Sequence, residues 1–249
     1  MKISKMIQMG AAALLLSGTA MADSVDLSGW KANGAQGNWV VQTGNDAVLQ
    51  TVNSSQSTFF HNDTNSQGQT LSGEITVQTT SDNDFMGFVL GYNEGDFANA
   101  NADYILIDWK QANQGSGAEG LAISRVTGAL NTGSHFTDAW SHTGVVEELA
   151  RATNLGSTGW NNNETYSFDL IFTASLIQVF VNDVKELSIS GTFNNGSFGF
   201  YNLSQQNVLY AGIEESAVPQ VPLPAALFMF APALLGFMGL RRKKKATAA

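Results

Sequence analysis

Residues 104–109 read Tyr104-Ile105-Leu106-Ile107-Asp108-Trp109, a run rich in β-branched and aromatic residues. Successive side chains of a β-strand point to opposite faces, so Ile105, Ile107 and Trp109 share one face and Asp108 lies on the other. We expect the apolar face to be core. The stretch therefore predicts a strand with one buried face.

The same alternation recurs along the chain and predicts further strands at residues 71–77, 85–92, 121–126, 166–172, 177–181 and 197–201. Clusters of Gly, Asn, Asp and Ser separate them, and residues 145–152 form the one segment with a helical pattern. Within residues 179–187, Asn182-Asp183 suits the positive φ of a tight hairpin turn. Many short strands without a βα rhythm predict an all-β, antiparallel, two-sheet jelly-roll sandwich of the concanavalin A-like class.

The body of the chain, residues 23–215, is strongly acidic. It holds five of the 12 basic residues and all 21 acidic ones, which gives a formal charge of −16. Such a charge argues against nucleic acid or an anionic membrane surface as partner, and it favours divalent cations or basic partners. The chain has no cysteine, which excludes thiol catalysis and disulfides, and its three histidines argue against a transition-metal site.

The N-terminus has the layout of a secretory signal peptide. Lys2 and Lys5 precede an apolar run over residues 6–16, and Ala20 and Ala22 form a small-residue cleavage site. We therefore expect residues 1–22 to be a signal helix that is removed after Ala22 on export.

The C-terminus is organised as a membrane anchor. Residues 216–224 are a proline-bearing linker, residues 225–240 are apolar, and residues 241–249 begin with five basic side chains. A basic cluster directly after an apolar segment stays in the cytoplasm. The 16 apolar residues would form about 24 Å of helix, short of a hydrocarbon core of about 30 Å. We expect a marginal transmembrane helix that anchors the chain temporarily in the inner membrane.

This tail resembles the PEP-CTERM class of sorting domains, in the variant that reads Val221-Pro222-Leu223-Pro224-Ala225. The resemblance implies recognition by an exosortase-type enzyme, which cuts the tail and passes the protein to the cell envelope or extracellular matrix. The alternative is a plain single-span anchor that is never cut.

The body resembles the C-terminal domain of thrombospondins over several motifs in the same order. These are residues 71–77, 79–92 and 104–111, followed by residues 140–144, 159–160 and 199–207. The family pattern has an aspartate triplet before an aromatic residue, a strand ending Phe-Gly-Tyr and a strand ending Trp-Lys-Gln. The resemblance implies a legume-lectin-like jelly roll, calcium at a loop edge, and a cell-surface or matrix interaction role. Residues 1–249 contain neither the family's calcium-binding repeats nor an Arg-Gly-Asp motif.

Asp82, Asn83 and Asp84 are the best candidates for calcium ligands, because hard oxygen ligands crowded in one loop suit that ion. Asn83 replaces one aspartate of the family triplet. Glu94, Asp96 and Asp103 bracket the loop at residues 93–102, and this loop could donate further ligands or a sugar-facing carboxylate. Asp96 and Asp103 are the candidates for the further ligands. The alternatives are a solvated acidic turn and an ordinary variable insertion.

Other chemistry-bearing residues have a structural interpretation. Trp109, Trp140 and Trp160 are candidates for stacking on sugars, but their positions favour core packing, and His142 is expected to be a buried structural histidine. Glycosidases of this fold need two carboxylates across a cleft, usually alternating along one strand, and no Glu-x-Asp run lies in a predicted strand.

The sequence thus predicts a non-enzymatic, exported protein that binds calcium and a glycan or protein ligand. A surface polysaccharide hydrolase and a passive structural coat protein remain the alternatives.

Overall fold

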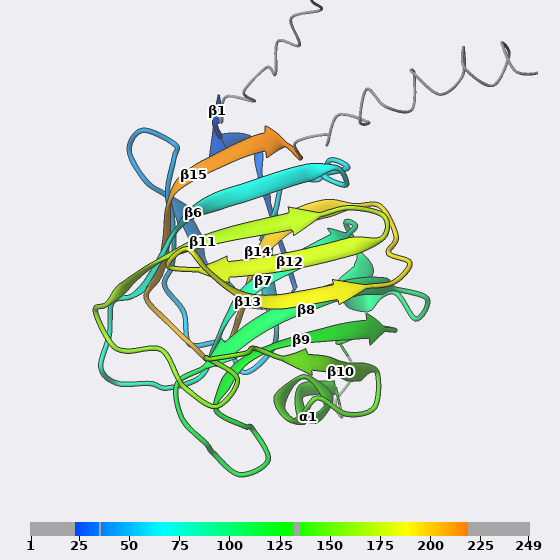
Figure 1. Cartoon of the computed structure of the whole chain (residues 1–249). Coiled ribbons are helices and arrows are strands. Elements are labelled where there is room, and N and C mark those ends of the chain that lie inside the picture. The colour runs from blue at the N-terminus through cyan, green and yellow to red at the C-terminus, as the bar shows by residue number, and fades with distance from the viewer. Residues whose placement is uncertain (1–22, 35, 132–134, 219–249) are drawn as a thin grey trace, which may run out of the picture. The chain divides into compact units, whose positions relative to one another are not determined.

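Two antiparallel sheets stack face to face in the computed structural model, which describes residues 23–34, 36–131 and 135–218 (Figure 1). The seven-stranded sheet runs β10 (Val146–Arg151), β9 (Gly120–Thr127), β8 (Asp103–Lys110), β7 (Phe85–Tyr92), β14 (Ser197–Leu203), β5 (Thr58–His61) and β2 (Lys31–Gly34). The eight-stranded sheet runs β13 (Val184–Ser190), β12 (Leu176–Val181), β11 (Thr165–Phe172), β6 (Gln69–Val77), β15 (Val208–Ala217), β4 (Val48–Gln50) and β3 (Trp39–Val41), and β1 (Asp23–Ser24) pairs with β15. This architecture confirms the predicted all-β antiparallel sandwich, with a strand at each predicted segment.

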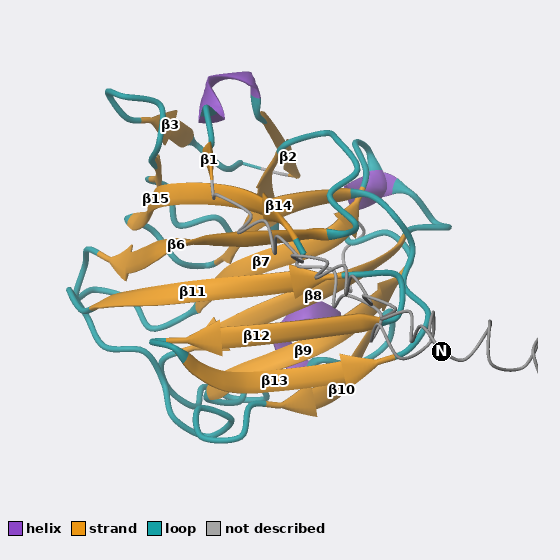
Figure 2. Ribbon diagram, turned by 45° about the horizontal axis from the view of Figure 1, so that its top comes forward, coloured by secondary structure: helices purple, strands orange, loops and turns teal. Residues whose placement is uncertain are grey.

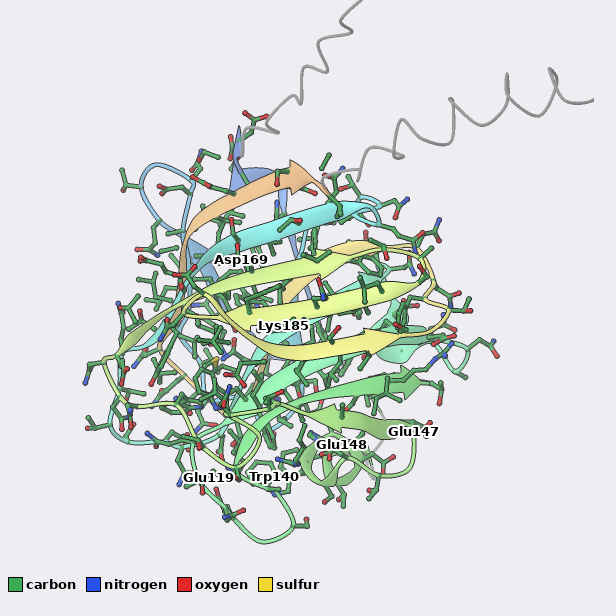
Figure 3. The ribbon with its side chains drawn as sticks, viewed as in Figure 1. Glu119, Trp140, Glu147, Glu148, Asp169 and Lys185 are labelled. Carbon is green, nitrogen blue, oxygen red and sulfur yellow. The ribbon has the colours of Figure 1, made fainter. Side chains whose placement is uncertain are left out.

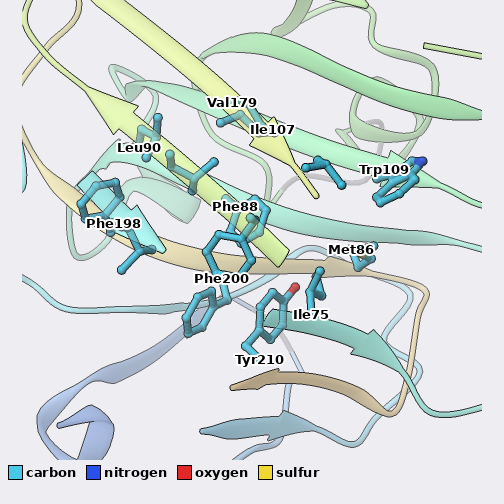
Figure 4. Close-up of a cluster of buried hydrophobic side chains, with 14 of the residues drawn as sticks. Ile75, Met86, Phe88, Leu90, Ile107, Trp109, Val179, Phe198, Phe200 and Tyr210 are labelled. Atoms are coloured by element: carbon cyan, nitrogen blue, oxygen red, sulfur yellow. The ribbon is translucent and has the colours of Figure 1, made fainter. Parts of the chain in front are cut away.

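The core lies between the sheets and is rich in aromatic side chains. Phe88 and Phe200 of the seven-stranded sheet meet Tyr210 of the eight-stranded sheet (Figure 4). Phe88 also meets Phe168 of the eight-stranded sheet. The ring centroids of Phe200 and Tyr210 are 4.2 Å apart, and those of Phe88 and Phe168 are 4.5 Å apart. Each such aromatic pair contributes about 1 kcal/mol beyond the area it buries, so these contacts fix how the sheets pack.

Both faces of the seven-stranded sheet are buried along its five central strands, β9, β8, β7, β14 and β5, which the alternation at residues 104–109 did not predict. Ile105, Ile107 and Trp109 face the core as expected, but Asp108 on the opposite face is also buried. Helix α1 (His135–Ser141) lies over that outer face (Figure 2). Its Ala139 belongs to a second apolar cluster that covers the face. The 3-10 turn η2 (Asp96–Ala98) adds Phe97 to the same cover; η1 (Leu27–Gly29) precedes β2. The eight-stranded sheet instead alternates buried and partly exposed residues along β11 and β12.

The helix predicted at residues 145–152 is wrong, because this segment forms edge strand β10. Its backbone pairs with β9 from Val146 to Arg151, with a bulge between Glu148 and Ala150. Hydrogen bonding to a neighbouring strand overrides a weak helical preference in so short a segment. The helix in this region, α1, comes earlier.

The hairpin joining β12 and β13 is confirmed. Asn182 and Asp183 have φ of 49° and 63°, the left-handed values that a two-residue turn of this kind needs. At the other end of the body, β15 continues to Ala217, two residues beyond the predicted boundary, because Ser216 and Ala217 still pair with β6.

The predicted signal peptide and sorting tail lie outside the described residues. Within the residues that are described, no helix is long and apolar enough to cross a membrane.

Candidate functional site

The five predicted calcium ligands do not form one cluster. Asp82, Asn83 and Asp84 lie in the loop before β7, whereas Asp96 follows its last residue and Asp103 opens β8 at that same far end. The eight residues of β7 span about 26 Å, so the two groups lie at opposite ends of the sandwich.

Asp96 and Asp103 both have structural partners. Asp96 closes its own turn, because its carboxylate accepts hydrogen bonds from the Asn93 backbone N–H at 2.8 Å and the Asn99 side chain at 3.0 Å. Asp103 accepts two hydrogen bonds of 2.6 Å from Arg125. These bonds hold the pKa of Asp103 below its usual range. Hydrogen bonds made by Asp96 and Asp103 therefore fix the loop at residues 93–102 and its end at β8.

Asp84 is paired with a buried lysine. The Lys110 Nζ atom lies 2.6 Å from Asp84 Oδ1, and the two side chains are 0% and 5% exposed. The same ammonium donates to the Asn83 carbonyl at 3.1 Å and to Gln114 Oε1 at 3.3 Å, with Asn83 Oδ1 at 3.5 Å. Its three protons are thus directed at oxygen atoms of two separate loops.

Two aromatic rings complete the surroundings of this ammonium. Lys110 Nζ lies 4.5 Å from the centre of the Trp140 ring and 5.2 Å from that of Phe85, and both rings attract a cation. The loop at residues 111–117 packs closely on Trp140 and Lys110 at Gly117. A Cβ at this position would come within 2.6 Å of Trp140 Nε1 and 3.1 Å of Lys110 Cε. Lys110 is therefore enclosed by the acidic turn, the loop at residues 111–117 and helix α1.

Asp82 is the one carboxylate of the turn that reaches the surface. It accepts hydrogen bonds from the Asn53 side chain and from the Asn83 backbone N–H at 3.0 Å. Partial burial and the neighbouring Asp84 carboxylate raise the pKa of Asp82 to about 6.

A polar hollow of about 340 Å³ opens beside Asp82, and we call it the amide hollow. Its walls are Thr80, Ser81, Asp82, Asn83, Gln111 and Gln114. The Gln111 side chain donates to Asn162 at 2.9 Å, and Trp140 Nε1 donates to the Gln114 carbonyl at 3.1 Å. The walls thus carry one carboxylate and five neutral hydrogen-bonding side chains.

An aromatic pair is linked to this hollow through Trp140, which is hydrogen-bonded to the wall residue Gln114. Phe136 and Trp140 of α1 stack with centroids 5.3 Å apart, and Phe136 is 37% exposed. Figure 3 shows Trp140 on the α1 side of the sandwich, away from Asp169 and Lys185 of the eight-stranded sheet. Trp109 and Trp160 are buried, as their expected core role requires, whereas Trp140 is partly exposed.

The residues at the acidic turn fit a calcium ion poorly. Their donor atoms are oxygens, which suits calcium, but the ion takes roughly six to eight of them. The carboxylate of Asp84 already holds the Lys110 ammonium, whose charge repels a metal ion. Among the described residues, no three Asp, Glu, His or Cys side chains gather as a metal site would require. Calcium binding at Asp82 stays a prediction.

His142 is the buried structural histidine that the sequence predicted. Its Nε2 lies 3.0 Å from Asp108 Oδ2 and its Nδ1 lies 2.9 Å from Glu148 Oε2, with the ring 6% exposed. Burial alone lowers the pKa of the imidazole, but the two carboxylates outweigh it and raise that pKa to about 9. Glu148 also binds Arg151 at 2.9 Å. Asp108 and Glu148 are therefore joined through an imidazolium and do not face an open cleft as a catalytic pair would.

Sequence reasoning missed Lys110 as a site residue. The Trp-Lys-Gln ending of β8 was the available signal, since it places Lys110 and Gln111 beside the acidic turn. The partnership of His142 with Asp108 had no such signal, because 34 residues separate them.

This fold is that of a lectin-like sandwich. The carbohydrate-binding module CBM66 from Bacillus subtilis superposes with a TM-score of 0.55, 11% identity and coverage of 76% of this chain and 96% of that one. The VIP36 exoplasmic/lumenal domain in its Ca²⁺/Man₃GlcNAc-bound form gives a TM-score of 0.52 and 12% identity, covering 80% and 88%. At these identities the likeness concerns the fold alone.

The family is shown by sequence. The model of the thrombospondin C-terminal region matches residues 34–217, and the chain belongs to this family. Thrombospondin-2 of Gallus gallus is 28% identical over 196 residues, which cover 71% of this chain and 16% of thrombospondin-2. Thrombospondin-3 of Homo sapiens is 24% identical over 209 residues, covering 74% and 21%. The chain therefore spans a fifth or less of the length of thrombospondin-2 and about a fifth of that of thrombospondin-3.

Proposed function

We propose that this chain is a non-enzymatic binding module and that its amide hollow recognises a neutral glycan. The observation that carries the proposal is the composition of the hollow, whose wall residue Gln114 is hydrogen-bonded to Trp140 of the Phe136–Trp140 pair. Amide and hydroxyl groups both donate and accept hydrogen bonds, as sugar hydroxyls do, and an aromatic ring offers an apolar face for a sugar ring. The lectin-like fold and the family membership support a binding role.

The charge of the body favours a neutral ligand over an acidic one. A domain with a formal charge of −16 repels uronic-acid or sulfated polysaccharides at a distance. The carboxylate of Asp82 repels them again within the hollow. The hydrolase alternative would need a second carboxylate in this hollow, and Asp82 is the one acid among its lining residues.

Calorimetric titration of the purified full chain tests this proposal. Neutral oligosaccharides should bind, and matched uronic-acid oligosaccharides should bind more weakly. Gln111→Ala removes a wall amide and should weaken binding about tenfold, the effect of about 1.4 kcal/mol from a lost hydrogen bond. Phe136→Ala should weaken binding several-fold.

Val184→Ala is the matched control, since Val184 is an exposed apolar side chain at the start of β13, on the other sheet. It should leave binding unchanged. Equal affinities in the Gln111 variant and the wild type would place the ligand elsewhere. A chain that binds no oligosaccharide would favour the passive coat protein.

We also propose that the chain works outside the cytoplasm after its two ends have been processed. The support is the signal-peptide pattern ending at Ala22, the motif at residues 221–225 with the apolar and basic segments behind it, and membership of the thrombospondin C-terminal family. An exosortase-type enzyme is the proposed partner for the tail.

A further inference from the structure

We propose that the ammonium of Lys110 is the built-in cation of the acidic turn, so that the amide hollow is held in shape without a divalent metal ion. The part that concerns the hollow depends on the proposed function, whereas the part that concerns the turn does not.

The argument begins with charge. Asp84 lies in the interior, where an unpaired carboxylate is costly, and no cation except Lys110 is paired with it among the described residues. The ammonium is fully buried at 2.6 Å from Asp84 Oδ1. A lysine would leave water so completely only where oxygen atoms replace its hydration.

The surroundings of Lys110 Nζ provide that replacement. Three oxygen acceptors lie within 3.3 Å, namely Asp84 Oδ1, the Asn83 carbonyl and Gln114 Oε1. They match the three protons of an ammonium group, and the faces of Phe85 and Trp140 occupy further directions. These oxygen atoms therefore take the place of water around the Lys110 ammonium.

The same contacts connect the walls of the amide hollow. Asn83 belongs to the acidic turn, Gln114 belongs to the loop after β8, and both line the hollow. Trp140 brings α1 to the same point through its bond to the Gln114 carbonyl. Lys110 thus acts as a positioning residue that joins three separate segments. A bound calcium ion would have to displace it.

Thermal unfolding of the purified full chain tests the role of the cation. The wild-type melting temperature should respond equally to calcium chloride, to magnesium chloride and to sodium chloride of matched ionic strength, and it should ignore a chelator. A calcium-specific rise that Asp84→Asn abolishes would overturn the proposal. The response of the melting temperature to calcium is measured on the wild-type protein, so it needs no variant.

Variants then test the ion pair. Lys110→Met leaves the Asp84 carboxylate without a partner and should lower the melting temperature by about 10 °C. Adding Asp84→Leu to that variant should restore most of the loss, since neither charge then remains buried. Lys185→Met, which removes an exposed lysine of β13, is the control and should change little. A small effect of Lys110→Met, or no recovery in the double variant, would contradict the internal pairing.

Oligosaccharide titration with and without chelator addresses the hollow. Binding that survives chelation supports a metal-free hollow, and binding lost on chelation contradicts it. Should no oligosaccharide bind at all, the proposed function fails alone, because the melting experiments judge Lys110 independently.

Discussion

At the scale of single residues, His142 makes stability depend on pH. Its pKa is raised to about 9 by Asp108 and Glu148, against a usual value near 6.5. A raised pKa stabilises the fold fully below pH 6.5, and this contribution disappears as the pH rises through 9. We expect His142→Gln to lower the free energy of unfolding by about 3 kcal/mol at pH 6 and by much less at pH 9.5. Urea unfolding at both pH values measures this difference.

His61 is the matched control, because its charge behaves in the opposite way. It is buried beside Ser197 at 3.1 Å, and burial lowers its pKa. Its stabilising contribution is therefore lost as the pH falls below 6.5. The difference in the free energy of unfolding between wild type and His61→Gln should become smaller at acid pH. The corresponding difference for His142→Gln should become smaller at alkaline pH. If both differences change in the same direction with pH, one of the two histidine charge states is misassigned.

At the scale of elements, the turn between β12 and β13 requires left-handed backbone at Asn182 and Asp183. Asp183 has a φ of 63°, a left-handed value that costs a β-branched residue about 1–2 kcal/mol. Its charge also acts on Asp169, whose pKa is raised by burial and by Asp183. We expect Asp183→Gly to raise the free energy of unfolding by about 0.5 kcal/mol and Asp183→Val to lower it by about 1 kcal/mol. The midpoints of urea unfolding, compared at an unchanged dependence of the unfolding free energy on urea, measure both changes. An Asp183→Val variant more stable than the Asp183→Gly variant would exclude this turn geometry.

The same hairpin shows what sequence reasoning can reach at this scale. Its turn and strands depend on adjacent residues, so alternation and turn chemistry predicted them. The edge strand β10 depends on pairing with β9, and the cover over Asp108 depends on α1, neither of which is local. Periodicity in one segment carries no information about what packs on it, so both were missed.

The candidate site divides in the same way. Asp82 and Asp84 were predicted from their crowding in one loop, and the structure keeps them together. The pairing of Asp84 with Lys110 joins residues 26 positions apart, and the walls of the amide hollow come from two loops. Charge composition indicated that a cation was needed, but only the three-dimensional arrangement shows that the chain supplies one itself.

At the scale of the whole molecule, charge is divided sharply between the parts of the chain. The body carries all 21 acidic residues, and residues 241–245 are uniformly basic. A basic cluster behind a short apolar segment resists translocation, whereas a long domain translocates largely regardless of its charge. This division favours a body outside the cytoplasm and a tail that marks where transport stops.

Mass spectrometry of the chain made in a bacterium that carries an exosortase-type enzyme tests this organisation. The mature protein should begin at Asp23 and lack residues 241–249, which include the basic residues 241–245. The double substitution Pro222→Ala and Pro224→Ala should leave the tail intact and the protein in the membrane fraction, because it alters the motif that the enzyme is proposed to read. Pro219→Ala, outside the motif, should be processed normally. A wild-type protein that stays in the membrane with its tail intact would instead identify a plain anchor. A protein found in the cytoplasm with residues 1–22 still attached would refute export.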